Sequence, residues 1–318
     1  MAPENGGPRW PVGRAQTRQK VTPMADYAFE IADHAFRRLV REDTPVERIA
    51  AGFGFTEGPI WRGDHLLFSD IPASRIVRWQ QTPEGPEVVT FRTPSGNANG
   101  LTLDHSGRLI ACEHTTRRVT RTEADDSLTV VAERFQGRRL SSPNDVVVAG
   151  DGSIYFTDPP YGLPNQSEGR ELPFNGVFRV VPDGSLTLLV DDFERPNGLA
   201  FSPDRKTLYV DDTARHHIRA FRVDSSGSLS GGEVFAELRS SEPGGPDGMK
   251  VDVEGNIYCT GSGGIWVFAP TGRKLGRIVL PELPANVAWG GPDWRTLYVT
   301  ARTGVYRLQV EVAGLPGG

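Results

Sequence analysis

The chain has 318 residues, with 37 Gly, 25 Pro, two Cys and a formal net charge of −5. Gly and Pro show no three-residue period, which excludes collagen, and both destabilise helix interiors, which excludes a largely helical protein. The chain is acidic overall and has no long basic run, so its charge gives no electrostatic support for binding to nucleic acid.

The N-terminal part of the chain differs from the rest. Residues 1–23 contain four Lys/Arg and no apolar stretch, so they predict a disordered leader rather than a secretory signal. Residues 24–47 predict a short helical segment, centred on 26–40. The apolar residues that could line one face of this helix are Phe29, Ile31, Phe36 and Leu39.

The segment that follows, residues 48–312, contains one pattern six times. Each copy has a polar residue, an apolar run, a turn and a second strand with an aromatic residue. The copies begin at intervals of 39–53 residues, with Glu57, Asn99, Asn144, Asn197, Asp247 and Asn286. Asp-x-x-Gly or Pro-Asp-x-x supplies the hairpin turn. Further apolar runs follow each hairpin, so each repeat predicts an antiparallel sheet of about four strands.

A small sheet of this kind cannot bury both faces alone, whereas six sheets packed radially around an axis can do so. The sequence therefore predicts an all-β fold, a six-bladed β-propeller over 48–312, with residues 313–318 as a tail. A β-sandwich or jelly roll is the alternative, and the sixfold recurrence argues against it.

The leading residues of the six repeats form the first candidate site. The innermost strands of a propeller line its central channel, so residues at the start of each inner strand should converge in a ring. Carboxylate and amide oxygens suit a hard cation such as Ca²⁺ or Mg²⁺, whereas Zn²⁺ usually recruits His or Cys. Asn and Asp before Gly are also common turn residues, but Glu57 has no special role in turns.

Polar residues at the ends of the second strands are further candidates. Asp70, Asp158 and Asp212 recur in FSD, FTD and VDD, and we interpret them as caps of blade turns, with a share in the pocket left open. His114, after a similar strand, and Tyr161, in DPPYG, should face the same mouth and are predicted substrate contacts.

Other chemistry has little support in the sequence. There is no Gly-x-Ser-x-Gly elbow, no His-Glu-x-x-His and no P-loop. Cys112 and Cys259 lie in apolar strand-like runs and are predicted to be buried free thiols. No apolar run reaches the ~18 residues of a membrane-spanning helix. We therefore expect a cytoplasmic protein without a membrane partner, and the sequence leaves its oligomeric state open.

Taken together, the motifs resemble the gluconolactonase/SMP-30 (regucalcin) family, especially its bacterial lactonase branch. The resemblance covers about residues 50–310. The motifs that carry it are TEGPIW, PSGNANGLTLD, LIACEH, SPNDVVV, FTDPPYG, RPNGLAFSPD and PDGMKVD.

The resemblance implies one divalent cation, usually Ca²⁺, at the mouth of the channel, with Mg²⁺ or Zn²⁺ as alternatives. It also implies the ligands, which are Glu57, Asn144, Asn197 and Asp247. Asn99 and Asn144 are expected to orient the sugar hydroxyls. The SMP-30 branch has an Arg two residues before the Asn144 position, and this chain has Ser142 there, so the substrate preference of that branch does not transfer.

The implied function is hydrolysis of a small-molecule sugar lactone to the aldonic acid. The cation would polarise the carbonyl, and Asp247 would act as base or nucleophile. A phosphotriesterase-like esterase on the same metal site, and a non-catalytic calcium-binding propeller, are the alternatives, because the scaffold alone does not fix the reaction.

Overall fold

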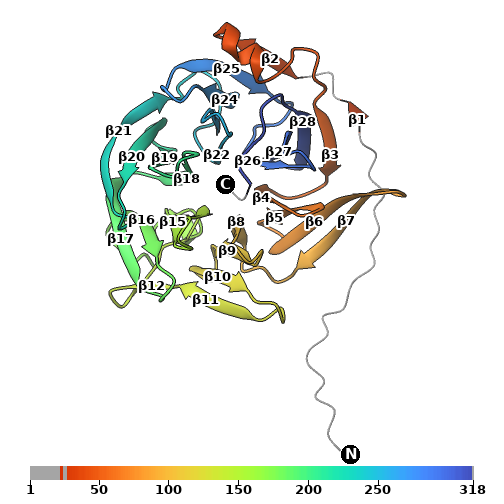
Figure 1. Cartoon of the computed structure of the whole chain (residues 1–318). Coiled ribbons are helices and arrows are strands. Elements are labelled where there is room, and N and C mark those ends of the chain that lie inside the picture. Colours follow the sequence, from red (N-terminus) through yellow and green to blue (C-terminus); the bar gives the residue numbers. More distant parts are fainter. Residues whose placement is uncertain (1–21, 24–26, 317–318) are drawn as a thin grey trace, which may run out of the picture.

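The protein is described from a computed structural model that covers residues 22–23 and 27–316. Six antiparallel sheets stand around a central axis like the blades of a propeller (Figure 1). This confirms the predicted fold class. Most of the predicted leader, residues 1–21, lies outside the described part of the chain, as do residues 24–26 and 317–318.

Each blade has four core strands that follow one another in sequence, except in blade 6. Blade 1 contains β4 (Thr56–Arg62), β5 (His65–Asp70), β6 (Arg75–Thr82) and β7 (Gly85–Arg92). Blade 2 contains β8 (Ala98–Leu103), β9 (Leu109–Glu113), β10 (Arg118–Thr122) and β11 (Leu128–Ala132). Blade 3 contains β14 (Val146–Val148), β15 (Ile154–Asp158), β16 (Asn175–Val180) and β17 (Leu186–Phe193). Blade 4 contains β18 (Pro196–Phe201), β19 (Thr207–Asp212), β20 (His217–Val223) and β21 (Leu229–Glu237).

The last two blades are completed by the N-terminal part of the chain. Blade 5 contains β22 (Met249–Val251), β23 (Ile257–Gly261), β24 (Gly264–Phe268) and β25 (Lys274–Val279), with β2 (Ala28–Ile31) as a fifth strand. Blade 6 contains β26 (Asn286–Gly290), β27 (Thr296–Ala301), β28 (Gly304–Gln309), β3 (Glu47–Ala51) and β1 (Thr22–Pro23). Since β3 pairs with β28, the two ends of the repeat region close the ring. The hairpin β12 (Arg134–Phe135) and β13 (Arg138–Arg139) and the 3-10 helix η2 (Pro164–Gln166) lie in loops.

The predicted helix over 26–40 is wrong for most of its length. Residues 28–31 form β2, which pairs with β25, and only residues 34–38 are helical, as the 3-10 helix η1 (His34–Arg38). Phe29 and Ile31 are two residues apart, which is the period of a strand edge rather than of a helix face. Asp33 then caps η1 by accepting a hydrogen bond from the Ala35 amide at 2.8 Å.

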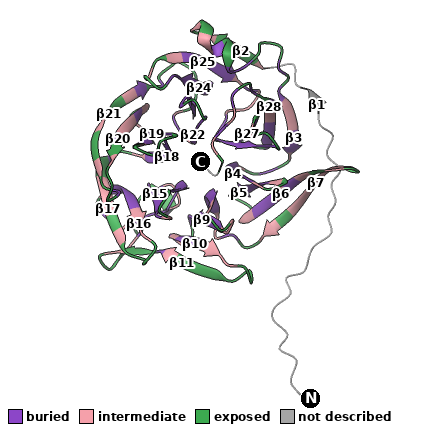
Figure 2. Cartoon of the chain, viewed as in Figure 1, coloured by how far each residue is buried: buried purple, intermediate pink, exposed green. Residues whose placement is uncertain are grey.

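The hydrophobic core is divided among the six boundaries between blades. Each of six apolar clusters joins two neighbouring blades; one contains Ile60 of blade 1 and Leu101 of blade 2. Figure 2 shows the inner strands buried and the outer strands increasingly exposed. Because burial of one large apolar side chain contributes about 1.5–3 kcal/mol, each blade depends on both neighbours for its stability.

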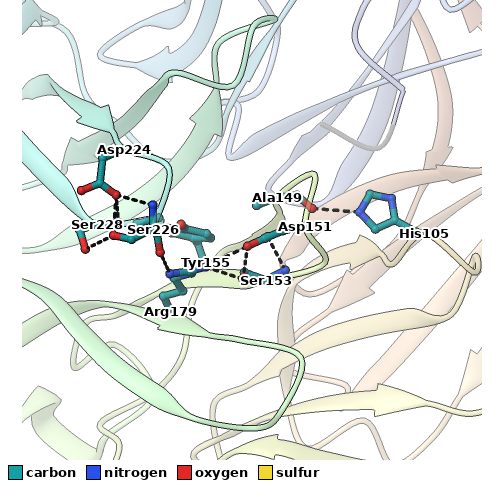
Figure 3. A network of polar contacts seen from close by, with 10 residues as sticks. His105, Ala149, Asp151, Ser153, Tyr155, Arg179, Asp224, Ser226 and Ser228 are labelled. Atoms are coloured by element: carbon teal, nitrogen blue, oxygen red, sulfur yellow. Dashed lines mark hydrogen bonds and ion pairs between the residues drawn. The ribbon is translucent and has the colours of Figure 1, made fainter.

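The two ends of the channel are built differently. We call the end where the inner strands begin the mouth end, and the end with the hairpin turns after the inner strands the turn end. At the turn end, the Arg179 guanidinium pairs with Asp151 at 2.9 Å and donates to the Ser226 carbonyl, while the Tyr155 hydroxyl donates to the Gly227 carbonyl at 2.9 Å (Figure 3). These contacts join blade 3 to blade 4.

Two smaller expectations can be compared with the structure. Cys112 and Cys259 are free and buried, as predicted. Within the described residues, no helix is long and apolar enough to cross a membrane. The tail after β28 contacts the turn end of blade 5, where Gly314 forms a β-bridge with Asp252.

Candidate active site at the mouth of the channel

The inner strands bring the six leading residues to the mouth end, as the repeat predicts. Each lies at the start of an inner strand or one or two residues before it, and all except Asp247 are buried. Asp247 keeps some exposure to solvent. The ring therefore has a buried wall with one carboxylate that solvent can reach.

Hydrogen bonds between blades hold this ring in place. The Gly100 amide donates to the Asn144 carbonyl, and the Gly198 amide donates to the Asp247 carbonyl, both at 2.8 Å. The Ser69 hydroxyl of blade 1 donates to the Asn99 carbonyl of blade 2, also at 2.8 Å. The backbones of these three leading residues are thus fixed by neighbouring blades, which leaves their side chains free for other contacts.

Close approach of the strands explains a feature shared by four of the six repeats, a glycine directly after the leading residue. A Cβ atom built on Gly248 would lie 1.9 Å from the side chain of Asn286. Only a residue without a Cβ allows Asn286 to lie there. From this position, the Asn286 amide donates to the Glu57 carboxylate at 3.0 Å.

Glu57 and Asp247 form the acidic centre of the site. The Oε2 atom of Glu57 accepts hydrogen bonds from the Gly58 amide at 2.5 Å and from Asn286, whereas its Oε1 atom has no partner among the described residues. Burial raises the pKa of Glu57 to about 7. Desolvation, and then the charge of Glu57, raise the pKa of Asp247 well above its usual range. Two carboxylates that oppose each other's ionisation in this way are suited to share a cation.

Further oxygen atoms near this pair have no hydrogen-bond partner in the described chain. They are Oδ1 of Asn99, Oδ2 of Asp145 and Oδ1 of Asp211. Because buried polar atoms are normally paired, such a group of acceptors fits a hard cation. No three His, Cys, Asp or Glu side chains within the described ranges gather as a metal cluster. A cation here would therefore depend on amide oxygens as well as carboxylates.

The two predicted amide ligands are placed differently. The amide of Asn197 lies close enough to Asp247 to lower the pKa of that carboxyl, and its Nδ2 donates to the Thr213 hydroxyl at 3.1 Å. Asn144 is buried, and its backbone carbonyl accepts the Gly100 amide. The role of its side chain as a ligand stays a prediction.

His114 is paired with one of the ring residues. Its Nε2 atom lies 3.2 Å from the Nδ2 atom of Asn99, so the amide donates to the unprotonated ring nitrogen. Burial lowers the pKa of His114 to about 4, which keeps the ring neutral near pH 7. The predicted substrate contacts Asn99 and His114 thus form one unit.

Tyr161 approaches the site from the long loop between β15 and β16. Its hydroxyl is buried and has no partner in hydrogen-bond geometry among the described residues. Burial, and then the charge of Asp247, raise its pKa to about 12, so the phenol remains a hydrogen-bond donor. The Arg195 guanidinium lies over its ring, 5.4 Å from the centre. This geometry makes Tyr161 available to a ligand at the mouth.

The carboxylates at the ends of the second strands are turn caps. Asp70 accepts the Gly54 amide at 3.0 Å, Asp158 accepts the amides of Ser141 and Ser142 at 2.7 and 2.8 Å, and Asp212 accepts the Glu194 amide at 2.8 Å. This confirms the interpretation as structural caps. It leaves the acidic centre to other residues.

Three buried charged residues near the centre were missed by the sequence analysis. Asp145 lies where four other repeats have Gly. Asp211 lies where other blades have Ser69, Thr157 or Thr260. Lys250 lies where the other blades have uncharged residues. Alignment of the six repeats with one another would have revealed all three. The mouth therefore contains a second, deeper group of charges.

Comparisons with known proteins agree with this architecture. Residues 55–303 match the family described as SMP-30/Gluconolactonase/LRE-like region. The gluconolactonase of Zymomonas mobilis subsp. mobilis is 36% identical over 297 residues, covering 85% of this chain and 83% of the relative. The pentonolactonase of Haloferax volcanii is 32% identical over 259 residues, covering 78% of this chain and 81% of the relative.

A solved structure extends the similarity to three dimensions. A gluconolactonase from Xanthomonas campestris superimposes with a TM-score of 0.85 at 32% identity. The match covers 94% of this chain and all of the other. The similarity therefore includes the complete propeller.

Proposed function

The chain belongs to the SMP-30/gluconolactonase/LRE-like family, and from this premise we propose that it is a divalent-metal-dependent lactonase that hydrolyses a sugar lactone to the aldonic acid. Its relatives are named gluconolactonase and pentonolactonase, which places the chain among enzymes that hydrolyse carboxylic esters.

The observation that carries the metal-dependent part is the carboxylate pair of Glu57 and Asp247. Burial raises the pKa of both groups, and the charge of Glu57 raises the pKa of Asp247 further. Glu57 in addition has an unpartnered Oε1 atom. Such a pair is costly in a propeller that needs only to fold, because carboxylates held close together away from water destabilise the folded state.

The proposed ligands of the cation are Glu57, Asn144, Asn197 and Asp247. Ca²⁺ is our first choice because all four supply oxygen atoms and none is His or Cys. A bound divalent cation supplies Lewis-acid polarisation of the lactone carbonyl and stabilises negative charge on its oxygen.

Asp247 is the proposed base because it is the ring carboxylate that solvent can reach. Its carboxylate takes a proton from water, the water oxygen bonds to the carbonyl carbon, and the ring C–O bond then breaks. The departing alkoxide oxygen takes the proton back and becomes a hydroxyl of the open-chain acid. Direct attack of the Asp247 carboxylate on the carbonyl carbon, followed by hydrolysis of the anhydride, is the alternative with the same products.

Substrate orientation is assigned to the polar groups on the wall of the mouth. Asn99, held by His114 at 3.2 Å, has a free Oδ1 acceptor for a sugar hydroxyl. Tyr161 offers a donor, and the Asn144 amide can both donate and accept. Donors and acceptors on several blades suit a polyhydroxylated ring better than an apolar ester.

A pH-stat assay with glucono-1,5-lactone tests this proposal. We expect hydrolysis that is lost after treatment with EDTA and restored by Ca²⁺. Hydrolysis unaffected by complete removal of metal would contradict the metal-dependent mechanism. Turnover of an organophosphate alone would favour the phosphotriesterase-like alternative, and no turnover of either class would favour the binding propeller.

A further inference from the structure

Lys250 is a buried cation that the proposed reaction does not use. The chain has 31 Arg and only four Lys, and Lys250 is 4% exposed. Its ammonium group donates one hydrogen bond, to the Met249 carbonyl at 3.1 Å. A buried ammonium with a single neutral partner is unfavourable unless negative charges lie nearby.

The position of Lys250 on its strand places it beneath the acidic centre. Lys250 lies on β22, an inner strand (Figure 1). The Cα–Cβ direction at Gly248 points at the Asn286 side chain. Residues two apart on a strand face the same side, so Lys250 projects from β22 on the side of Asn286, one step deeper in the channel.

Two carboxylates supply the negative charge that Lys250 needs. The positive charge of Lys250 acts on Glu57 and on Asp145, lowering the pKa of each against the stronger effect of burial. The Asn286 amide, which donates to Glu57, also lowers the pKa of Asp145. One polar cluster therefore continues inward from the mouth, and it consists of Glu57, Asp145, Asn286 and Lys250.

We propose that Lys250 is the built-in counter-ion of the candidate cation site, and that its fixed positive charge weakens cation binding at Glu57. The inference rests on the metal-dependent part of the proposed function. A cation at the mouth and the ammonium below it share the charge of one carboxylate, so they repel each other. In a protein interior with an effective dielectric constant near 20, such repulsion is large enough to change affinity by about tenfold or more.

The other five repeats support a specific role for this charge. The corresponding residues are Ile60, Thr102, Val147, Ala200 and Trp289. All are uncharged, so the propeller fold itself does not require a cation at this position. The charge occurs only in the blade that also provides Asp247.

The test is calorimetric titration of the cation-free full-length protein with Ca²⁺. Lys250→Met and Lys250→Gln remove the charge, Lys250→Arg keeps it, and Lys206→Met removes a charge from an exposed turn as a matched control. We expect the two neutral variants to bind Ca²⁺ about tenfold more tightly than the wild type or better. Lys250→Arg should stay within about threefold of the wild type, and Lys206→Met should be unchanged.

The outcomes separate this inference from the function on which it rests. Wild-type protein that binds no divalent cation would remove the metal-dependent proposal. Wild-type binding with unchanged or weaker binding by folded Lys250→Met and Lys250→Gln would overturn the role of Lys250 alone. An equal gain in Lys250→Arg would also overturn it, because shape rather than charge would then be the cause. If both neutral variants fail to fold while Lys250→Arg folds, the carboxylates require the charge, which supports the counter-ion role.

Discussion

The mouth end and the turn end of the same propeller differ in how their buried polar groups are hydrogen-bonded. At the turn end, Arg179, Tyr155 and Asp151 are joined by hydrogen bonds and an ion pair between blades (Figure 3). At the mouth, Glu57 and Tyr161 have buried oxygen atoms without partners in the described structure. The network at the turn end joins two blades through groups of the protein itself, although Nε of Arg179 has no partner there, whereas the unpartnered oxygen atoms of the mouth are available to a ligand.

The difference has an energetic meaning. A hydrogen bond within the protein contributes about 0.5–1.5 kcal/mol, whereas a buried polar atom without a partner costs about 1–3 kcal/mol. The hydrogen bonds at the turn end therefore stabilise the ring of blades. The unpartnered groups at the mouth lower the stability of the folded state, and they remain available to bind a cation and a substrate. Substitutions at the two ends should separate stability from activity.

Asp247→Asn should cause the largest loss of activity. The variant keeps the size of the side chain but cannot take a proton or attack a carbonyl, so we expect kcat on gluconolactone to fall by about 10²–10⁴-fold. Circular dichroism and thermal unfolding should show a folded protein, because removal of one of two opposed carboxylates relieves repulsion. Near-normal turnover by this variant would show that Asp247 is not the base or nucleophile.

Stability of the cation-free protein should depend on pH through Glu57. Its pKa is raised from 4.5 to about 7, so between these values the folded state binds more protons than the unfolded state. The free energy of unfolding contributed by this group is therefore lost as pH rises through that window. Relative to Glu57→Gln, the wild type should lose on the order of 3 kcal/mol between pH 4.5 and 8.

Urea denaturation in EDTA at several pH values measures this difference. His114, whose pKa is lowered to about 4, acts in the opposite sense below its ordinary pKa of 6.5, but it is present in both proteins and cancels in the difference. Identical pH profiles for the wild type and Glu57→Gln would show that the pKa of Glu57 is not raised in the folded state.

Addition of Ca²⁺ should increase the stability of the wild type, because the cation gives the carboxylates at the mouth a partner. At about 100 times its dissociation constant, a ligand that binds only the folded state stabilises it by about 2.7 kcal/mol. Glu57→Gln should show a much smaller increase in melting temperature under the same conditions, since it lacks one ligand charge. An equal increase in both proteins would remove Glu57 from the cation site.

The ring and the fold could be predicted from the sequence because the same short pattern recurs in register six times. Radial packing then requires that Glu57, Asn99 and their counterparts converge. Alignment of the repeats marks Asp211 and Lys250 as exceptions, but it does not show what they do, because periodicity does not show which charges meet across blades. The helix expected over 26–40 failed because a strand added to a neighbouring blade is set by tertiary pairing rather than by local period.

Two tyrosines allow a matched comparison of the two ends. Tyr161→Phe removes a hydroxyl that has no partner in the described structure, so we expect little change in stability. If that hydroxyl donates to the substrate, KM for gluconolactone should rise by roughly tenfold, equivalent to about 1.4 kcal/mol. Unchanged KM and kcat would exclude Tyr161 as a substrate contact.

Tyr155→Phe should have the smallest effect, and an opposite one. It removes the donor to the Gly227 carbonyl but keeps the ring, which packs edge-on against Phe201 at 5.2 Å and lies 5.7 Å from the Arg179 guanidinium. Only the hydrogen bond between blades 3 and 4 is lost, so the free energy of unfolding should fall by about 1 kcal/mol. KM, kcat and Ca²⁺ affinity should not change, because the turn end takes no part in binding. A change in KM for Tyr155→Phe, or a loss of stability in Tyr161→Phe of the same size, would mean that the two ends are not divided between folding and chemistry.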